Sequence, residues 1–107
     1  MITNYINKGD IFLVELNGRG SVINKTRPCI VLKAISSIAT VIPITSKIKG
    51  NRNHLFLKAN KNGLIKDSEA LFEQITTVDR EQLIKPLGRL DDSDVLKLNN
   101  KLIEVLC

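Results

Sequence analysis

Residues 28–45 read PCIVLKAISSIATVIPIT, and this stretch decides the fold because it holds two runs of strand-forming residues in quick succession. Residues 28–34 and 40–45 are rich in valine, isoleucine and threonine, which favour pleated strands. Consecutive strands usually lie side by side, so we expect these two to pair. Pro28 is tolerated at the first position of its strand, whereas Pro43 indicates an edge strand or a bulge.

Outward from this stretch, the same kind of pattern predicts further strands. They are expected at residues 10–16, 54–58, 70–78 and 84–90. Loops or turns are expected at residues 17–25, 46–53 and 60–63. One helical turn at residues 79–83, capped by Asp79, separates the last two strands.

Residues 91–106 change period, because apolar side chains recur every three or four residues and predict one helix with a single apolar face. That face comprises Val95, Leu98, Leu102 and Val105. Three aspartates and a serine at residues 91–94 provide a cap and the negative charge that a helix N-terminus favours. We therefore expect a single domain over residues 1–107 with a mainly β, α+β fold: a small antiparallel, barrel-like sheet packed against one C-terminal helix.

The composition is that of an ordinary globular protein, with 43% hydrophobic and 25% charged residues in a chain of 107. No apolar run approaches the roughly 20 residues that a membrane span needs, and the N-terminus lacks a secretion-signal pattern. We therefore expect a cytoplasmic protein without membrane contact. Cys29 and Cys107 lack disulfide or metal-site spacing, so reduced thiols and no structural metal are expected. The small size favours self-association.

The charge is unevenly distributed along the chain. Residues 1–66 carry eleven basic and two acidic side chains, a net charge of +9, whereas residues 67–107 carry five basic and nine acidic side chains, a net charge of −4. A local basic excess suits a polyanion such as nucleic acid, because neutralised phosphates release counterions. A solvated lysine-rich face would produce the same pattern, so charge alone leaves both interpretations open.

Most enzyme classes lack the groups they need in this sequence. His54 is the only histidine, no phosphate-binding GxxxxGK loop or dinucleotide-binding motif occurs, and the acidic residues are concentrated late in the chain. A two-histidine metal site and a carboxylate cage for magnesium are therefore not expected. Arginines, lysines, hydroxyls and one imidazole remain. These groups suit cleavage of RNA through its own 2′-hydroxyl, which needs charge stabilisation and proton transfer.

Arg27 and Thr45 are the strongest candidates for such a site. Arg27 lies where the predicted loop of residues 17–25, which is rich in glycine, meets a strand, and Pro28 restricts the backbone beside it. Thr45 and Ser46 end the next predicted strand, so pairing of the two strands would bring their hydroxyls to the same rim. Taken singly, an arginine before a strand is commonly a surface charge, and a threonine at a strand end is commonly a turn residue.

Six segments in register add weight to this combination. They are GDIFLVEL at residues 9–16, GS at 20–21, RPCIVL at 27–32, VIPITS at 41–46, GLIKDSEALFEQITTVDREQL at 63–83 and PLGRLDD at 86–92. In order and approximate spacing they resemble the MazF/PemK family of toxin endoribonucleases (mRNA interferases) from type II toxin–antitoxin systems. The resemblance covers nearly the whole chain.

The resemblance implies an SH3-like, CcdB/PemK-type barrel with a C-terminal helix, assembled as a homodimer. It also implies metal-independent, sequence-specific cleavage of single-stranded RNA, without a cofactor, to 2′,3′-cyclic phosphate and 5′-hydroxyl ends. The family's RP-motif arginine falls on Arg27, its PxT threonine on Thr45, its small polar loop residue on Ser21 and its groove glutamine on Gln74. The expected protein partner is an antitoxin whose acidic, partly disordered tail covers the basic groove.

On chemical grounds, Arg27 stabilises the charged pentavalent phosphorane, since a guanidinium with a pKa above about 12 is a poor base. Thr45 hydrogen-bonds a phosphoryl oxygen and holds the scissile group in line. The general base is unassigned, because many relatives have Glu-Gln in the first loop where this chain has Val22 and Ile23. His54, with an ordinary pKa near about 6.5, is one replacement, and a structural histidine is the other interpretation.

Further RNA contacts are expected from polar side chains. They are Ser21, Ser46, Lys47, Lys49, Arg52, His54 and Gln74. Two other functions fit the same fold. A CcdB-like gyrase inhibitor without catalysis is disfavoured, because such proteins act through a tryptophan and this chain has none. A noncatalytic RNA-binding barrel would account for the charge equally well, and only the pattern around Arg27 and Thr45 argues against it.

Overall fold

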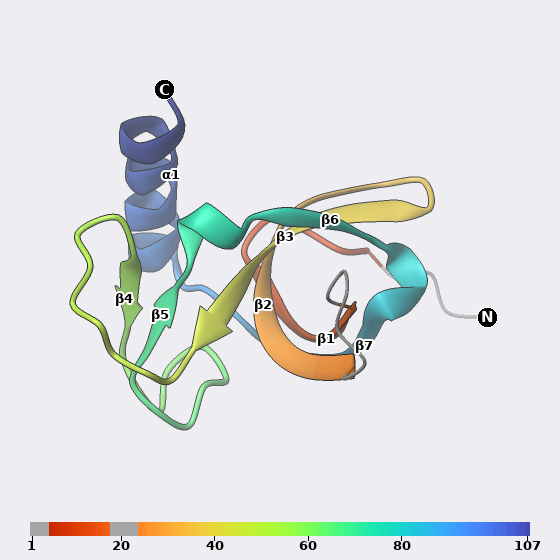
Figure 1. Ribbon diagram of the computed structural model, residues 1–107, viewed down its shortest axis with the longest axis horizontal. Helices are drawn as coiled ribbons and strands as arrows, with labels where there is room; N and C mark the ends of the chain where they lie inside the picture. Colours follow the sequence, from red (N-terminus) through yellow and green to blue (C-terminus); the bar gives the residue numbers. More distant parts are fainter. Residues whose placement is uncertain (1–4, 18–23) are drawn as a thin grey trace.

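A strongly curved antiparallel sheet and one C-terminal helix make up most of the computed structural model, which describes residues 5–17 and 24–107 (Figure 1). The strands are β1 (Asp10–Asn17), β2 (Asn24–Ile35), β3 (Ile38–Thr45), β4 (Leu55–Leu57), β5 (Ser68–Ala70), β6 (Thr76–Asp79) and β7 (Leu83–Arg89). The helices are two short 3-10 helices, η1 (Phe72–Gln74) and η2 (Arg80–Gln82), and the α-helix α1 (Asp92–Leu106). The predicted mainly β fold with a C-terminal helix is confirmed.

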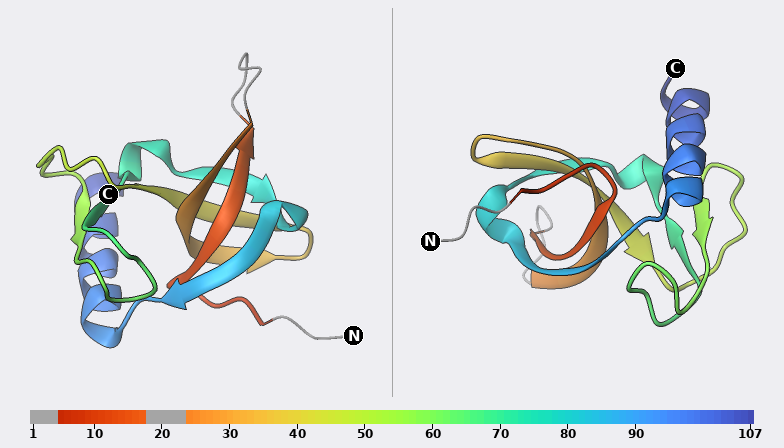
Figure 2. Two further views of the ribbon diagram at one scale, coloured as in Figure 1. Left: turned by 90° about the horizontal axis from the view of Figure 1, so that it is seen from below. Right: turned by 180° about the vertical axis from the view of Figure 1, so that it is seen from behind.

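The strands lie in the order β4-β5-β3-β2-β1-β7, with β6 paired to β3, and all the pairings are antiparallel. β2 and β3 are neighbours as predicted, with Cys29 opposite Pro43 and Val31 opposite Val41. β1, β2 and β7 curl around one end of the molecule (Figure 2). Within the described residues the outermost strands, β4 and β7, do not pair, so the predicted barrel is an open, coiled sheet.

The middle parts of β2 and β3 are buried on both faces, because each face contributes to a separate hydrophobic cluster. Successive side chains of a strand point to opposite faces. Accordingly, Ile30 and Ile42 join the cluster that packs against α1, whereas Val31 and Val41 join the cluster inside the curved part of the sheet. This double burial explains why residues 28–45 are the most continuously apolar part of the sequence.

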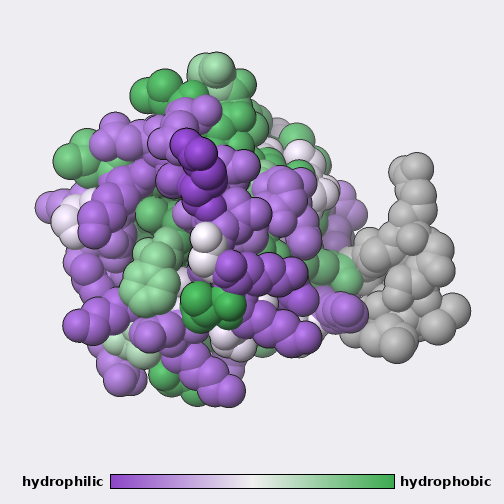
Figure 3. All heavy atoms as spheres, turned by 60° about the vertical axis from the view of Figure 1, so that its left-hand side comes forward, coloured by the Kyte–Doolittle hydropathy of each residue, from purple (hydrophilic) through white to green (hydrophobic). Residues whose placement is uncertain are grey.

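α1 presents the predicted apolar face to the sheet. Leu98 is fully buried, and Val95, Leu102 and Val105 pack against the same cluster. The Asp91 side chain caps the helix by accepting the Asp94 N–H at 2.9 Å. The side of the molecule that carries α1, β4 and β5 is otherwise largely hydrophilic, with separate apolar patches (Figure 3). In the described part of the chain, no helix has the length and hydrophobicity to cross a membrane.

The prediction of a single strand at residues 70–78 is wrong, because this segment contains the end of β5, the helix η1 and most of β6. β5 ends opposite Ile44 of β3, and β6 begins opposite Val41 of the same strand. Residues 71–75 therefore span a gap of only two residues on β3, and the surplus coils into η1. In this gap a backbone N–H donates to the Pro43 carbonyl at 2.8 Å. Pro43 thus marks an irregularity inside the sheet, and the edge-strand alternative for it is wrong.

β2 begins at Asn24, so Pro28 is not the first residue of its strand as predicted. Pro28 lies opposite Leu13 of β1, just outside the β2–β3 ladder, whose last pair joins Cys29 and Pro43. A proline is tolerated there because that ladder needs no donor beyond its end. The other strands, the turn after Asp79 and the helix agree with prediction to within two residues at each end, and the predicted first loop falls mostly outside the described residues.

Candidate active site

A cleft of about 620 Å³ opens where β2 and β3 separate. Beyond the end of their ladder, β2 pairs only with β1, while β3 turns to pair with β5. Arg27 lies on the first of these diverging strands and Thr45 on the second. The cleft is lined by Thr26, Arg27, Pro28, Ile44, Thr45, Ser46, Lys47, Gly63, Leu64, Ile65, Lys66, Ser68 and Leu87. The structure therefore brings both predicted catalytic residues into one cleft, together with Ser46 and Lys47.

The loop before β5 reaches this cleft through a close crossing of two glycines. Gly63 has a φ of +89°, and a Cβ on it would lie 2.2 Å from the Leu87 carbonyl oxygen. A Cβ on Gly88 would lie 2.1 Å from the Asn62 carbonyl oxygen. Any larger residue at either position would force the two backbones apart. The crossing lets the loop pass directly over β7 and form one wall of the cleft.

The same loop is fastened to the N-terminus of α1. Lys61 Nζ lies 2.9 Å from Asp91 Oδ2, and the Asn62 side-chain amide donates to Asp94 Oδ2 at 2.7 Å. Asn62 Oδ1 also accepts the Asp91 N–H at 3.0 Å. The hydrogen bond from Lys61 lowers the pKa of Asp91 to about 2, so this carboxylate is charged at neutral pH. The acidic cap of the helix therefore also supports the cleft wall.

Arg27 and Thr45 retain hydrogen-bonding capacity for a ligand. Thr45 Oγ1 accepts the Lys47 N–H at 3.1 Å, which leaves the hydroxyl hydrogen able to donate. Arg27 is half-buried, and within the described residues no hydrogen bond or ion pair engages its guanidinium. Lys47 and Lys66 add two further positive charges to the lining. A planar guanidinium and a hydroxyl donor that line one cleft are suited to bind a phosphate group.

Cys29, two residues from Arg27, is not a nucleophile for this cleft. Its side chain is fully buried, and burial raises the pKa of the thiol to about 12, although the positive charge of Arg27 acts in the opposite direction. The thiol is therefore protonated at neutral pH, and a protonated thiol is a poor nucleophile. Cys107 is exposed, and both cysteines are free thiols as predicted.

His54 does not share this cleft. It is only 6% exposed and lies between two glutamates, with Nδ1 2.9 Å from Glu69 Oε1 and Nε2 2.9 Å from Glu73 Oε1. Burial lowers the pKa of His54, but the hydrogen bonds and negative charges of both glutamates outweigh burial and raise that pKa above its ordinary value. Of the two interpretations of His54, general base or structural histidine, the burial and the two glutamate partners support the structural one, and the predicted RNA contact of His54 is corrected because the side chain lies outside the cleft.

Lys49 and Arg52 are exposed on the loop between β3 and β4 and do not line the cleft. Gln74 is exposed at a separate polar groove of about 290 Å³. Ser21 and the two apolar residues that follow it lie outside the described residues. Among residues 5–17 and 24–107, no group of three or more His, Cys, Asp or Glu side chains is arranged to hold a metal ion.

Comparison with known proteins identifies the family. A family model described as "PemK-like, MazF-like toxin of type II toxin-antitoxin system" matches residues 7–106. The chain belongs to this family. Endoribonuclease MazF9 of Mycobacterium tuberculosis is 31% identical over 109 residues, which covers 91% of this chain and 92% of the relative. Endoribonuclease EndoA of Bacillus subtilis is 30% identical over 105 residues, with coverage of 91% and 90%.

A solved structure of the MazF-like fold agrees with the architecture of this toxin. The MazE–MazF crystal structure from Deinococcus radiodurans matches with a TM-score of 0.77 at 20% identity, and the match covers 96% of this chain and 97% of that chain. At this level of identity the match bears on the fold alone. The open, coiled sheet with its C-terminal helix is therefore the MazF fold.

Sequence reasoning missed several residues of the toxin's cleft. Lys66 and Leu87 line it from segments far from Arg27 in the chain. Nothing near Lys66 in the sequence marks it as a site residue, because its position depends on the crossing of Gly63 over β7. Glu69 does not line the cleft, but its pairing with His54 was also missed. Here a sequence feature was available, because a carboxylate inside a buried apolar segment must have a partner.

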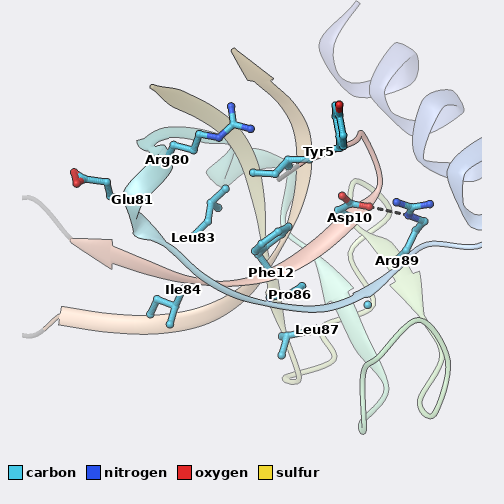
Figure 4. A pocket seen from close by; sticks show the side chains of 12 residues that line it. Tyr5, Asp10, Phe12, Arg80, Glu81, Leu83, Ile84, Pro86, Leu87 and Arg89 are labelled. Atoms are coloured by element: carbon cyan, nitrogen blue, oxygen red, sulfur yellow. Dashed lines mark hydrogen bonds and ion pairs between the residues drawn. The ribbon is translucent and has the colours of Figure 1, made fainter. Parts of the chain in front are cut away.

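The toxin has a second, larger hollow of about 930 Å³ over β1, η2 and β7 (Figure 4). Tyr5 and Phe12 line it, and Arg89 on its rim is already paired with Asp10, with Nε 2.8 Å from Oδ1. It shares only Leu87 with the cleft described above. Because it contains none of the predicted catalytic residues, we place the candidate active site in the smaller cleft.

Proposed function

We propose that this toxin is a metal-independent, sequence-specific endoribonuclease that cleaves single-stranded RNA, including mRNA, through the 2′-hydroxyl group of the substrate. The observation that carries the proposal is the cleft between the diverging ends of β2 and β3, whose lining includes both Arg27 and Thr45. Membership of the toxin family and the similarity to the endoribonucleases MazF9 and EndoA support it.

In this reaction the 2′-oxygen attacks the adjacent phosphorus, and the bond from phosphorus to the 5′-oxygen breaks. The departing 5′-oxygen takes up a proton from solvent water, and the products are a 2′,3′-cyclic phosphate and a 5′-hydroxyl. Negative charge develops on the nonbridging oxygens of the phosphorane, where the Arg27 guanidinium donates hydrogen bonds. Thr45 donates its hydroxyl hydrogen to one of these oxygens and keeps the reacting atoms in line. Lys47 and Lys66 attract the phosphate backbone of the RNA.

Metal independence is supported by the chemistry of the described cleft residues, which supply cations and hydroxyls but no carboxylate. A divalent cation at the phosphate position would be repelled by Arg27, Lys47 and Lys66. These three side chains would instead stabilise the negative charge of the phosphorane themselves. The proton of the 2′-hydroxyl goes to an acceptor other than His54, because both nitrogens of that ring are occupied by glutamates.

The proposal extends to protein partners. The Deinococcus structure holds MazE with MazF, and an antitoxin with an acidic, partly disordered tail would complement the positive charge of the cleft. A homodimer is supported by the large apolar side chains of Tyr5 and Ile84, which are exposed on the single chain and line the same hollow. With mRNA as substrate, we place the activity in the cytoplasm.

The test incubates purified toxin with a long single-stranded RNA in the presence of EDTA and sequences both product ends. Cleavage at a short motif with cyclic phosphate and 5′-hydroxyl ends is expected. Loss of cleavage in EDTA would overturn metal independence. RNA that is bound but stays intact under all conditions would instead indicate a noncatalytic RNA-binding protein.

Thr45→Val tests the role of the hydroxyl without changing the branched shape that β3 requires. Removing one preorganised donor typically lowers kcat about 100-fold or more, and we expect a loss of that order. Thr40→Val is the matched control, because Thr40 lies on the same strand and its hydroxyl contacts Thr77 instead of the cleft. If Thr45→Val cuts RNA as fast as Thr40→Val, the assignment of Thr45 is wrong.

A further inference from the structure

Glu69 is a buried carboxylate that the proposed reaction does not use. It is only 3% exposed, and it lies in β5 directly opposite Thr45 in the antiparallel ladder. Its two oxygens accept the backbone N–H groups of Lys49 at 3.2 Å and Gly50 at 2.9 Å. One side chain therefore joins the strand beside Thr45 to the middle of the loop that follows Thr45.

His54 completes the hydrogen bonds of this carboxylate at the far end of the same loop. Nδ1 lies 2.9 Å from Glu69, and Nε2 lies 2.9 and 3.1 Å from the two oxygens of Glu73. A carboxylate only accepts, so both ring nitrogens must donate, and only the protonated imidazolium has two N–H groups. At pH values below the raised pKa of His54, the cluster is therefore one cation held between two anions.

The other charged groups around the cluster belong to the loop and to α1. The ammonium of Lys49 interacts electrostatically with Glu73. Lys101 on α1 donates to the Arg52 carbonyl at 2.7 Å and pairs with Glu104 at 3.2 Å. The loop is thus held by β5 at Lys49 and Gly50, and by α1 near its end.

We propose that Glu69 is a positioning residue of the RNA-cleaving site: by holding the Lys49 and Gly50 amides, it fixes the loop of residues 46–53 and thereby the orientation of Thr45. This inference rests on the proposed endoribonuclease function. The loop begins at Ser46 and Lys47, which line the cleft, and the Lys47 N–H is bonded to the Thr45 hydroxyl oxygen itself. Displacement of the loop would therefore redirect the hydroxyl that holds the phosphate.

The charge state of His54 makes this positioning dependent on pH. Burial lowers the pKa of His54, but hydrogen bonds with both glutamates outweigh burial and raise that pKa overall. The contribution of charged His54 to the stability of the cluster is therefore fully present below pH 6.5, the ordinary pKa, and is lost as pH rises through the raised pKa. Burial raises the pKa of Glu69 and of Glu73, but their hydrogen bonds lower both pKa values overall. The contribution of the two carboxylates to the stability of the cluster is therefore lost only as pH falls through these lowered pKa values.

The experiment compares Glu69→Gln, Glu73→Gln and the control Glu81→Gln, which alters an exposed glutamate outside the cleft and the cluster. Cleavage of an RNA oligonucleotide is measured as kcat and KM across pH, and amide hydrogen exchange is followed at Lys49 and Gly50. Because misplacement of a reacting group by about 1 Å can cost about 100-fold, we expect kcat of Glu69→Gln to fall at least about tenfold, with faster exchange at both amides.

Glu73→Gln separates positioning from simple loss of stability. It removes one negative charge beside His54, so the alkaline limb of kcat and the alkaline loss of amide protection should shift together to lower pH. Lower stability alone would not shift this limb at temperatures well below Tm. This variant also decides the question if Glu69→Gln does not fold. Glu81→Gln should match the wild type in every measurement.

Two results would overturn the inference while leaving the proposed function intact. One is folded Glu69→Gln toxin with wild-type kcat, and the other is a Glu73→Gln pH profile that does not move. A wild-type protein that leaves RNA intact would overturn the proposed function, and the catalytic part of this inference with it. The exchange rates at Lys49 and Gly50 would still show whether Glu69 anchors the loop.

Discussion

The cleft around Arg27 and the cluster around His54 use charge in opposite ways, although the same loop connects them. In the cleft, three cations of like sign line an open surface, and the described residues offer the Arg27 guanidinium no partner. In the cluster, one cation lies between two anions at distances near 2.9 Å. Unpaired charge at the surface is therefore available to bind a ligand, whereas paired and buried charge stabilises the conformation of the backbone.

The energetics of the two regions follow from this difference. Groups in the cleft interact weakly with the rest of the protein, so their removal should affect activity and leave the free energy of unfolding nearly unchanged. His54 and Glu69 in the cluster are already desolvated, whereas Glu73 is exposed, so removal of His54 leaves the Glu69 carboxylate buried without compensation. Loss of a cleft residue should therefore reduce activity, whereas loss of a cluster residue should reduce stability.

The largest effect is expected for Arg27→Ala. Loss of the group that stabilises the phosphorane should lower kcat about 1,000-fold or more, while the free energy of unfolding changes by less than about 1 kcal/mol. RNA cleavage rates and urea unfolding measure the two quantities on the same samples. Lys97→Ala removes a positive charge on the exposed face of α1 and should change neither. If Arg27→Ala cuts RNA normally, the cleft is not the active site.

The second effect concerns the cluster. His54→Ala leaves two carboxylates facing each other, one of them buried, and should lower the free energy of unfolding by about 3 kcal/mol. Glu104→Ala removes one partner of the exposed ion pair with Lys101 and should cost less than about 1 kcal/mol. Urea unfolding near pH 6 would measure both free-energy changes. Equal costs for the two variants would contradict the distinction between paired buried charge and exposed charge.

A somewhat smaller effect is expected where the cleft wall crosses β7. Gly63→Ala places a methyl group against the Leu87 carbonyl in a left-handed backbone conformation, and overpacking with strain should cost about 2–3 kcal/mol. Gly50→Ala shares the positive φ but has open space around the added carbon, so it should cost only about 1 kcal/mol. Thermal unfolding distinguishes the two. Gly63→Ala should also impair cleavage, since the wall that carries Lys66 is displaced.

The smallest effect distinguishes two lysines of one loop. Lys47 lines the cleft and Lys49 does not, so Lys47→Ala should weaken RNA binding a few-fold and reduce the salt dependence by about 0.7 in the slope of log K against log salt. Lys49→Ala should leave the slope nearly unchanged. Binding titrations at several salt concentrations measure both. Identical slopes for the two variants would show that the RNA path extends beyond the cleft.

Much of the fold could be predicted because its patterns are local. The three- and four-residue spacing of Val95, Leu98 and Leu102 predicts a helix and also its buried face, and the cap at Asp91 is visible in the same stretch. Residues 70–78 could not be predicted correctly. Their break depends on where Pro43 of a distant strand interrupts two ladders, and no property of residues 70–78 themselves reveals it.

The sequence by itself determined that Arg27 and Thr45 end up together, because they lie on consecutive strands and such strands pair. Only the tertiary structure decided what surrounds them. Lys66 lines the cleft because two glycines allow its loop to cross β7, and His54 lies outside the cleft because it pairs with Glu69 and Glu73. The physical reason is that strand and helix patterns act over a few residues, whereas burial and charge pairing join residues that are far apart in the chain.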